Sequence, residues 1–554
     1  MQCLSDLLSF QVSLSWRQLV FDGQLWAKLD LRSFPRLPPA VLKQLAQTAG
    51  GFVQSLDLTG HASLKPETLE DVSRHLAVHI SGPNHNSLTY INLQGCYNLT
   101  TRSLHHILTR SPSLKYLNLR GQPAVTNATC ALLASHCPGL VSLNLSRCRN
   151  MTAEGIRSVA SAAVARGEHI IVKDLRLSGL RGVNDGMMAA LGRAAPFLEV
   201  LDLSYSMAHN SAIEAFVNCT SEDAAQFDTI QLTSREAGRD PSDSSRHWRR
   251  VTRLRHLNLS FCVLLTDHAC SHLAHTVPKL ELLELAGIGP ELRDDGLVRL
   301  LATTPHIRRI DLEDATEVTD RVLQALTPSA PPAPPTQPSS VSAAAAASSA
   351  RQAPEPGHAL EHLTISYANV ESDAMSELIR GCSRLRVLEA DNTRMTGLVL
   401  KEFVQTMRRR NVKDAKIVAV DCRSVGEHAV RELSASTRPR MGWRSWHARK
   451  LAFLDGKDNE KLEVGQDECD PSRVVVKTFY SWQTVDSVKA AREKKRLHGS
   501  RRGMSASGDS SASDNFSSSP GRTRWWSPSG RRSTGPNTPT LLDGAERGEG
   551  CTVM

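Results

Sequence analysis

The amino-acid sequence predicts an α/β solenoid, a horseshoe of short parallel strands in which each strand is followed by a helix. The first observation is a fixed period, because Leu88, Leu114 and Leu140 stand 26 residues apart (114−88 and 140−114). The second is a shared order within each unit: an opening leucine, an apolar-x-Leu pair three residues later, and then apolar residues at helical spacing. The third is composition, since 40% apolar but only 5% aromatic residues suit packing by leucine. A solenoid grows by stacking units, so 554 residues need not divide into several compact domains.

The repeat units are predicted over residues 41–435. Each unit begins with a version of L-x-x-L-x-L, and this motif at a period of about 20–29 residues is the signature of leucine-rich repeats. Two stretches break the period. We expect an irregular loop over about 220–250, where DTIQL is a degenerate strand, and a disordered Pro/Ala/Ser insertion over about 327–357. Further units open at Val53, Val172, Leu198, Leu254, Leu280, Ile307, Leu360 and Leu385.

Each unit places polar residues at the outward positions of its strand. Alternate strand residues point to opposite faces, so the leucines fill the core while their neighbours line the concave surface. Thr-Asp and Asp-Gly pairs, such as Thr266-Asp267 and Asp185-Gly186, are expected to start the helices by capping free N–H groups. The later outward residues are acidic and favour a basic partner, whereas the asparagines can instead satisfy the turns beside them. The predicted substrate face, beginning with Asp57, comprises Asn92, Asn118, Asn144, Arg176, Asp202, Asn258, Glu284 and Asp311.

Cysteines mark the repeat subtype. Cys96, Cys148 and Cys262 share one position shortly after the strand's last leucine. No paired C-x-x-C occurs, so a buried small side chain against the neighbouring turn is expected rather than a metal site. The pattern resembles the cysteine-containing leucine-rich repeats typical of F-box proteins. No secretory pattern is visible, so we expect the 12 cysteines to be reduced.

Residues 1–40 contain a second resemblance to that family. The segment VSLSWRQLVFDGQLWAKLDL, residues 12–31, is similar to the second half of an F-box. The resemblance implies a helical module that binds the Skp adaptor of cullin–RING ubiquitin ligases. The family's opening Leu-Pro helix is missing before Val12, so either the start is truncated or the module remains only as a cap on the first repeat. The residues implied in adaptor binding are Trp16, Leu19, Leu25, Trp26 and Leu29.

In the C-terminal third, the amino-acid composition changes twice. Residues 436–488 combine basic residues with aromatic ones such as Trp443, Trp446 and Trp482, and we expect them to form a cap on the last repeat. Nucleic-acid binding is the alternative for this composition. Residues 489–554 are predicted to be a disordered basic tail, which holds most of the excess in the net charge of +9.

The last four residues, Cys551-Thr552-Val553-Met554, match the C-a-a-X prenylation signal, and a terminal Met selects farnesyl. One lipid gives only weak membrane binding, so the upstream arginines Arg522, Arg524, Arg531 and Arg532 are expected to add attraction to anionic lipids. No apolar run reaches the length of a membrane span. We therefore expect a cytoplasmic protein held at a membrane surface by its lipid, with a nuclear location as the alternative.

No catalytic motif, cofactor-binding loop or metal-ligand cluster stands out in the sequence. The resemblance implies a non-catalytic substrate-recognition subunit of an SCF-type ubiquitin ligase, which binds its substrate on the concave strand face. A membrane-associated scaffold or signalling adaptor that does not assemble a ligase is the alternative. Nucleic acid is not the first expectation, since the basic residues gather in the tail rather than on the repeats.

Overall fold

A computed structural model describes residues 26–77, 85–221, 226–239, 242–329, 355–438 and 471–480. All of them belong to one compact unit, residues 1–493. The predicted tail (489–554), most of the insertion (327–357) and most of the cap (436–488) lie outside the described residues.

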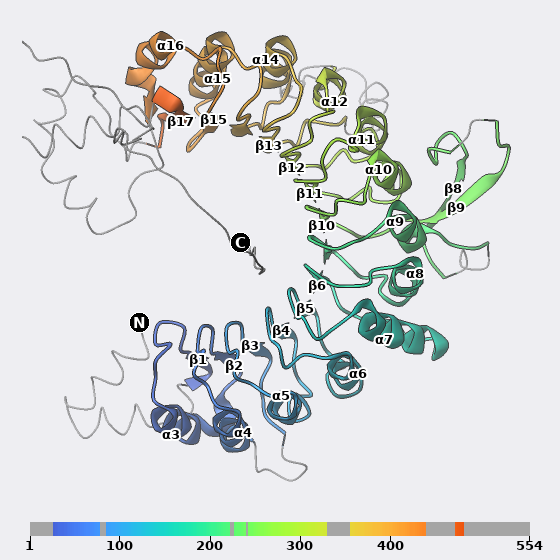
Figure 1. Cartoon of the computed structure of the whole chain (residues 1–554), viewed down its shortest axis with the longest axis vertical. Helices are drawn as coiled ribbons and strands as arrows, with labels where there is room; N and C mark the ends of the chain where they lie inside the picture. Colours follow the sequence, from blue (N-terminus) through green and yellow to red (C-terminus); the bar gives the residue numbers. More distant parts are fainter. Residues whose placement is uncertain are drawn as a thin grey trace, which may run out of the picture. The chain divides into compact units, whose positions relative to one another are not determined.

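The described residues form a parallel sheet of 15 strands, which confirms the predicted fold class (Figure 1). The strands pair in a constant register, so that Leu56 lies beside Ile91 and Ile91 beside Leu117. These central residues are buried and stack into one continuous core. In sheet order, the strands are β1 Lys28–Asp30, β2 Ser55–Asp57, β3 Tyr90–Asn92, β4 Tyr116–Asn118, β5 Ser142–Asn144, β6 Asp174–Arg176, β7 Val200–Asp202, β10 His256–Asn258, β11 Leu282–Glu284, β12 Arg309–Asp311, β13 His362–Thr364, β14 Val387–Glu389, β15 Lys416–Ala419, β17 Val474–Thr478 and β16 Thr437–Arg438.

Figure 1 shows the helices in a row along one side of the strands. Thr266 caps α10 by accepting a hydrogen bond from the N–H of His268, and Thr319 caps α12 in the same way. Helices therefore start at the Thr-Asp pairs, as predicted. The helices are α3 Pro39–Ala49, α4 Pro66–His75, α5 Thr101–Leu108, α6 Asn127–His136, α7 Ala153–Ala165, α8 Asp185–Ala194, α9 Asn210–Val217, α10 Asp267–Leu273, α11 Asp294–Leu301, α12 Asp320–Leu326, α14 Ser372–Gly381, α15 Gly397–Arg409 and α16 Glu427–Glu432.

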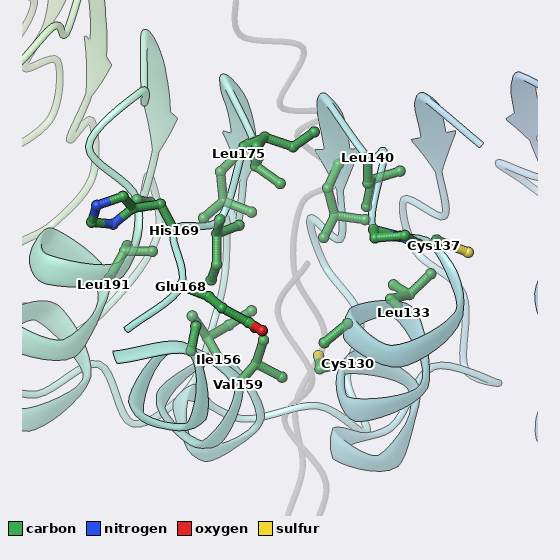
Figure 2. Close-up of a pocket in the computed structure, with 18 of the residues that line it drawn as sticks. Cys130, Leu133, Cys137, Leu140, Ile156, Val159, Glu168, His169, Leu175 and Leu191 are labelled. Carbon is green, nitrogen blue, oxygen red and sulfur yellow. The ribbon is translucent and has the colours of Figure 1, made fainter. Parts of the chain in front are cut away.

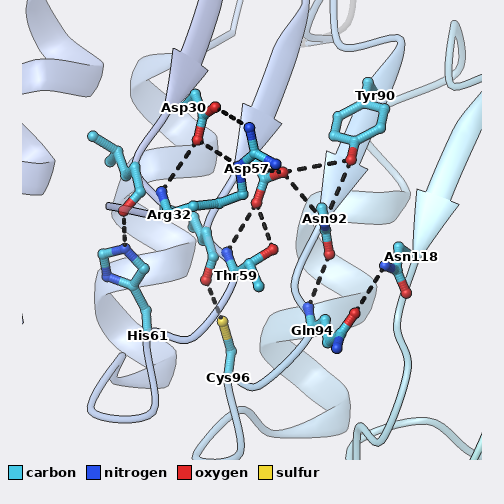
Figure 3. Close-up of polar contacts among 12 residues, drawn as sticks. Asp30, Arg32, Asp57, Thr59, His61, Tyr90, Asn92, Gln94, Cys96 and Asn118 are labelled. Carbon is cyan, nitrogen blue, oxygen red and sulfur yellow. Dashed lines mark hydrogen bonds and ion pairs between the residues drawn. The ribbon is translucent and has the colours of Figure 1, made fainter. Parts of the chain in front are cut away.

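The cysteine position of the repeat is confirmed as buried, and the structure shows what it contributes. The thiol of Cys96 donates to the carbonyl of Leu58 in the preceding repeat at 3.1 Å, and Cys148 donates to Leu119 at 3.2 Å. At the same repeat position, Gln122 donates to the carbonyl of Leu93, and His61 Nε2 lies 3.0 Å from the carbonyl of Leu31 (Figure 3). The position therefore holds a hydrogen-bond donor that satisfies a buried carbonyl between repeats, and cysteine is one of several solutions.

Three features differ from the expectations of the sequence. Leu29 lies in strand β1 rather than in a helix, because the L-D-L segment pairs with β2 as a first repeat strand. DTIQL overlaps a strand, β8 (Thr229–Thr233), but this strand pairs antiparallel with β9 (Arg246–Arg250) in a hairpin outside the main sheet. Strand β7 pairs directly with β10, so the hairpin interrupts the sequence without interrupting the stack. At the far end, β17 extends the sheet beyond β15, although its residues lie in the segment that we expected to form a cap.

Candidate partner-binding face

The helix-free side of the sheet carries the predicted ladder of polar side chains. Most of the ladder residues bind their own backbone: the side-chain oxygen of Asn92 accepts the N–H of Gln94 at 3.2 Å, and Asn144 accepts that of Ser146 at 3.0 Å. The interpretation that asparagines satisfy neighbouring turns therefore describes this part of the ladder. The residues that make this local bond are Asp57, Asn92, Asn118, Asn144, Asp202, Asn258 and Asp311.

Arg176 and Glu284, the other two predicted residues, form side-chain contacts instead. Arg176 donates to Asp174 within its own strand at 3.0 Å. Glu284 accepts a hydrogen bond of 2.6 Å from Asn258 and lies 3.5 Å from His256, and the hydrogen bond with His256 lowers the pKa of Glu284. Arg176 is thus engaged within its own strand, and Glu284 with the neighbouring strand β10.

At the first strands, the carboxylates are held by a local network (Figure 3). Asp57 is buried and accepts hydrogen bonds from the hydroxyl of Thr59 at 2.6 Å and from Asn92 at 3.2 Å. Arg32 lies 3.6 Å from Asp57 and also binds Asp30, whose pKa is lowered by that hydrogen bond. The negative charge of this end is therefore balanced within the protein.

Along one edge of the sheet, the residues just before the strands carry positive and negative charges that pair with one another. Lys173 pairs with Glu199 at 3.0 Å, and Arg308 pairs with Glu361 at 2.6 Å. Arg386 reaches the same Glu361 at 3.3 Å. Ion pairs as exposed as these contribute little to the stability of the fold.

Three carboxyl groups over β12–β14 have less compensation of this kind, and we call Asp311, Glu313 and Asp391 the acidic face. Burial raises the pKa of all three, and the nearby carboxylates Asp311 and Asp391 raise that of Glu313 further. Arg309 comes no closer than 4.0 Å to Asp311. Glu313 and Asp391 form no ion pair within the part of the chain that the structure describes.

Glu313 and Asp391 were absent from the predicted face. Each lies two residues after an outward strand residue, Asp311 and Glu389 respectively, so each continues the alternation past the end of its strand. Extending the period of two by one step would have found them. By contrast, Glu389 itself is held by His362 and Lys416, which lower its pKa to about 2.

The predicted adaptor-binding residues divide between described and undescribed parts. Trp26 and Leu29 are buried in the core beside β1, with 6% and 0% of their surface exposed. Trp16, Leu19 and Leu25 lie outside the described residues, as does Cys551. Adaptor binding and prenylation therefore stay predictions.

The described residues also enclose an apolar cavity of about 170 Å³ between α6 and α7. Figure 2 shows Leu133, Ile156 and Leu175 around it. It lies where the openers Leu140 and Val172 stand 32 residues apart (172−140), so this repeat is longer than its neighbours. None of the predicted face residues lines the cavity, which leaves the sheet as the candidate binding surface.

Within the described residues, no helix is long and apolar enough to cross a membrane. The same residues contain no group of three or more His, Cys, Asp or Glu side chains arranged to hold a metal ion. Their histidines and acids are instead placed in pairs along the repeats, such as His362 with Glu389.

Comparison with known proteins adds little to this picture. No protein-family model matches the sequence, and no curated protein matches it either. Among solved structures, the Rad7–Elc1 complex from yeast is similar at 16% identity and a TM-score of 0.41, covering 77% of this chain and 94% of that one. The TLR13–ssRNA13 complex is similar at 16% identity and a TM-score of 0.29, covering 63% of this chain and 41% of that one. At these values, neither similarity carries an argument about partners or activity.

Proposed function

We propose that this chain is a non-catalytic substrate-recognition subunit of an SCF-type ubiquitin ligase and that the acidic face binds a basic segment of the substrate. The observation that carries the proposal is the group of three carboxyl groups over β12–β14 whose pKa is raised: among the described residues Glu313 and Asp391 form no ion pair, and Asp311 has only Arg309 at 4.0 Å. A lysine or arginine side chain of a partner would supply the missing charge. The cysteine-containing repeats and the segment around Trp16 support the ligase assignment, and Cys551 supports a farnesyl anchor.

Substrate binding can be tested with labelled peptides of alternating Lys and Ser or Glu and Ser, using fluorescence anisotropy and the full-length chain. We expect Asp311→Asn/Glu313→Gln/Asp391→Asn to weaken binding of the Lys/Ser peptide by about tenfold or more. A matched control, Glu154→Gln/Asp295→Asn/Glu427→Gln, changes net charge equally on exposed helix residues and should have little effect. Equal losses in both triple variants would reject the acidic face as the site.

Ligase assembly is tested separately, by co-purification of the full-length chain with the Skp adaptor. We expect the adaptor to be retained, and retained less by Trp16→Ala. Failure of adaptor binding with intact peptide binding would reject the ligase and keep the binding face. For the anchor, Cys551→Ser should shift the protein from the membrane fraction to the soluble fraction, and unchanged fractionation would contradict prenylation.

One observation favours the alternative, a scaffold that binds partners without a ligase. Trp26 and Leu29 are buried against the first repeat, as a cap requires. If the chain is such a scaffold, the acidic-face variant still weakens binding of the Lys/Ser peptide. The Skp adaptor, however, does not co-purify with either the wild type or Trp16→Ala.

A further inference from the structure

One position of the repeat adopts a left-handed backbone conformation after every strand of the main sheet from β2 to β14. It lies three residues after the outward residue that ends each strand, and glycine occupies it at Gly95, Gly121 and Gly179. Bulky side chains occupy it at Arg147, Tyr205 and Phe261, after β5, β7 and β10, with φ values of 60°, 57° and 60°. This conformation is sterically unfavourable for any residue with a large side chain. The protein thus keeps three strained residues where glycine or asparagine would fit without strain.

These three side chains form a continuous stack, which we call the aromatic ridge. The rings of Tyr205 and Phe261 are stacked with centroids 4.5 Å apart and an angle of 12° between them. Arg147 covers Tyr205 with its guanidinium 5.5 Å from the ring centroid. Phe261 lies against Gly287, where a β-carbon would come within 2.5 Å of the ring. The ridge therefore crosses β5, β6, β7 and β10, with Gly179 and Gly287 leaving room for it.

The ridge is exposed and is bordered by apolar side chains. Tyr205 and Phe261 keep 52% and 41% of their surface in solvent. Met207, Val263 and Leu264, in the same two loops, are also exposed. Such a contiguous apolar patch on a soluble surface is typical of a site that binds a partner. Aromatic and arginine side chains are also the ones that dominate binding energy at protein interfaces.

The charge at one end of the ridge restricts the partner. Arg147, Arg149 and Arg181 gather there, and Arg181 donates to the backbone carbonyl of Arg149. None of the three pairs with a carboxylate among the residues that the structure describes. Three arginines without acidic partners favour a negatively charged occupant.

We propose that the aromatic ridge is a docking site for a protein segment that combines apolar side chains with carboxylates. The apolar side chains would cover Tyr205, Phe261 and Met207, and the carboxylates would meet the arginines. A nucleic acid fits less well, because base stacking needs a free ring face. Tyr205 is already covered on both sides, by Arg147 and Phe261. This site does not rest on the proposed function, since it uses different residues and the opposite charge from the acidic face.

The decisive variant is Tyr205→Asn/Phe261→Asn, because asparagine tolerates the left-handed conformation, as Asn392 does in its own repeat. Removing the rings should leave the thermal midpoint unchanged or raise it, while binding is lost. Tyr367→Asn is the matched control, since Tyr367 has the same repeat position, a φ of 67° and an exposed ring, but belongs to no ring stack that the structure describes.

The probes are labelled peptides of about 12 residues with alternating Glu/Leu, Lys/Leu or Glu/Ser, and an oligouridine of similar length. We expect the full-length protein to bind the Glu/Leu peptide at least about tenfold more tightly than the other three. The double variant should lose this preference, and Tyr367→Asn should keep it. Arg147→Glu, a change in an exposed side chain, should weaken the preference for Glu/Leu over Lys/Leu severalfold. This single variant also covers the case of a double variant that fails to fold. Tighter binding of oligouridine, or a lowered thermal midpoint with unchanged peptide binding, would overturn the proposal.

Discussion

The same position of the repeat has different surroundings near the start of the sheet, in β2, and further along it, in β12. Asp57 in β2 is buried, and its carboxylate lies near the guanidinium of Arg32 and accepts hydrogen bonds from Thr59 and Asn92. Asp311 in β12 occupies the equivalent position, accepts the N–H of Glu313 at 3.2 Å and has a raised pKa. The difference shows that a ladder of polar residues is not one uniform surface: Asp57 has several side-chain partners within the protein, whereas Asp311 has few.

The hydrophobic core should be equally well packed in both regions of the sheet. Leu56 in β2 and Leu363 in β13 are both fully buried at the centre of their strands. We expect Leu56→Ala and Leu363→Ala to lower the free energy of unfolding by similar amounts, about 2–5 kcal/mol each. Urea unfolding of the two variants measures this, and a several-fold difference would show that the ends differ in packing as well as in charge.

Removal of one negative charge should change the free energy of unfolding differently at Asp57 and at Asp311. Asp57→Asn keeps the shape of the side chain but loses the charged acceptor of Thr59 and Arg32, so we expect a loss of about 1–2 kcal/mol. Asp311→Asn keeps its local backbone bond and removes like-charge repulsion, so its stability should stay the same or rise by up to about 1 kcal/mol. Parallel urea curves at neutral pH provide the measurement, and equal destabilisation would contradict the comparison.

A smaller effect is expected in the pH dependence of stability. Since the pKa values of Asp311, Glu313 and Asp391 are raised by folding, their contribution is fully present below about pH 4, the pKa of the unfolded carboxyl groups, and is lost as pH rises through the raised values. The triple variant Asp311→Asn/Glu313→Gln/Asp391→Asn should therefore be more stable than the wild type at neutral pH, by up to about 1 kcal/mol, and should lose this advantage below about pH 4. Thermal midpoints across this range test it, and an advantage that grows toward acid pH would contradict the assignment.

The repeat array was largely predictable because its signal is local and repeated. The spacing of Leu88, Leu114 and Leu140 indicates the strands, and Thr266-Asp267 indicates a helix start. Strand β17 could not be placed, since its pairing with β15 joins residues far apart in the sequence and follows no period. Hairpin β8–β9 also breaks the repeat pattern, and its anchor, the ion pair of 2.7 Å between Arg249 and Glu214, becomes visible only in three dimensions.

The candidate site was predictable in position but not in role. The outward residues were identified by alternation, yet the sequence around Asp57 does not show that this carboxylate has a cation beside it. That depends on neighbouring strands, as with Arg32 from the loop after β1. The aromatic ridge was missed because a left-handed Tyr205 or Phe261 cannot be recognised without the backbone.

The central claim is that folding raises the pKa of the three carboxyl groups of the acidic face and that the positive charge of a bound basic partner lowers it again. Calorimetric titration of the full-length chain with the Lys/Ser peptide, at about pH 5 in two buffers of different ionisation enthalpy, counts the protons released. We predict proton release for the wild type and none for Asp311→Asn/Glu313→Gln/Asp391→Asn. Binding heats that are the same in both buffers for the wild type would contradict the account.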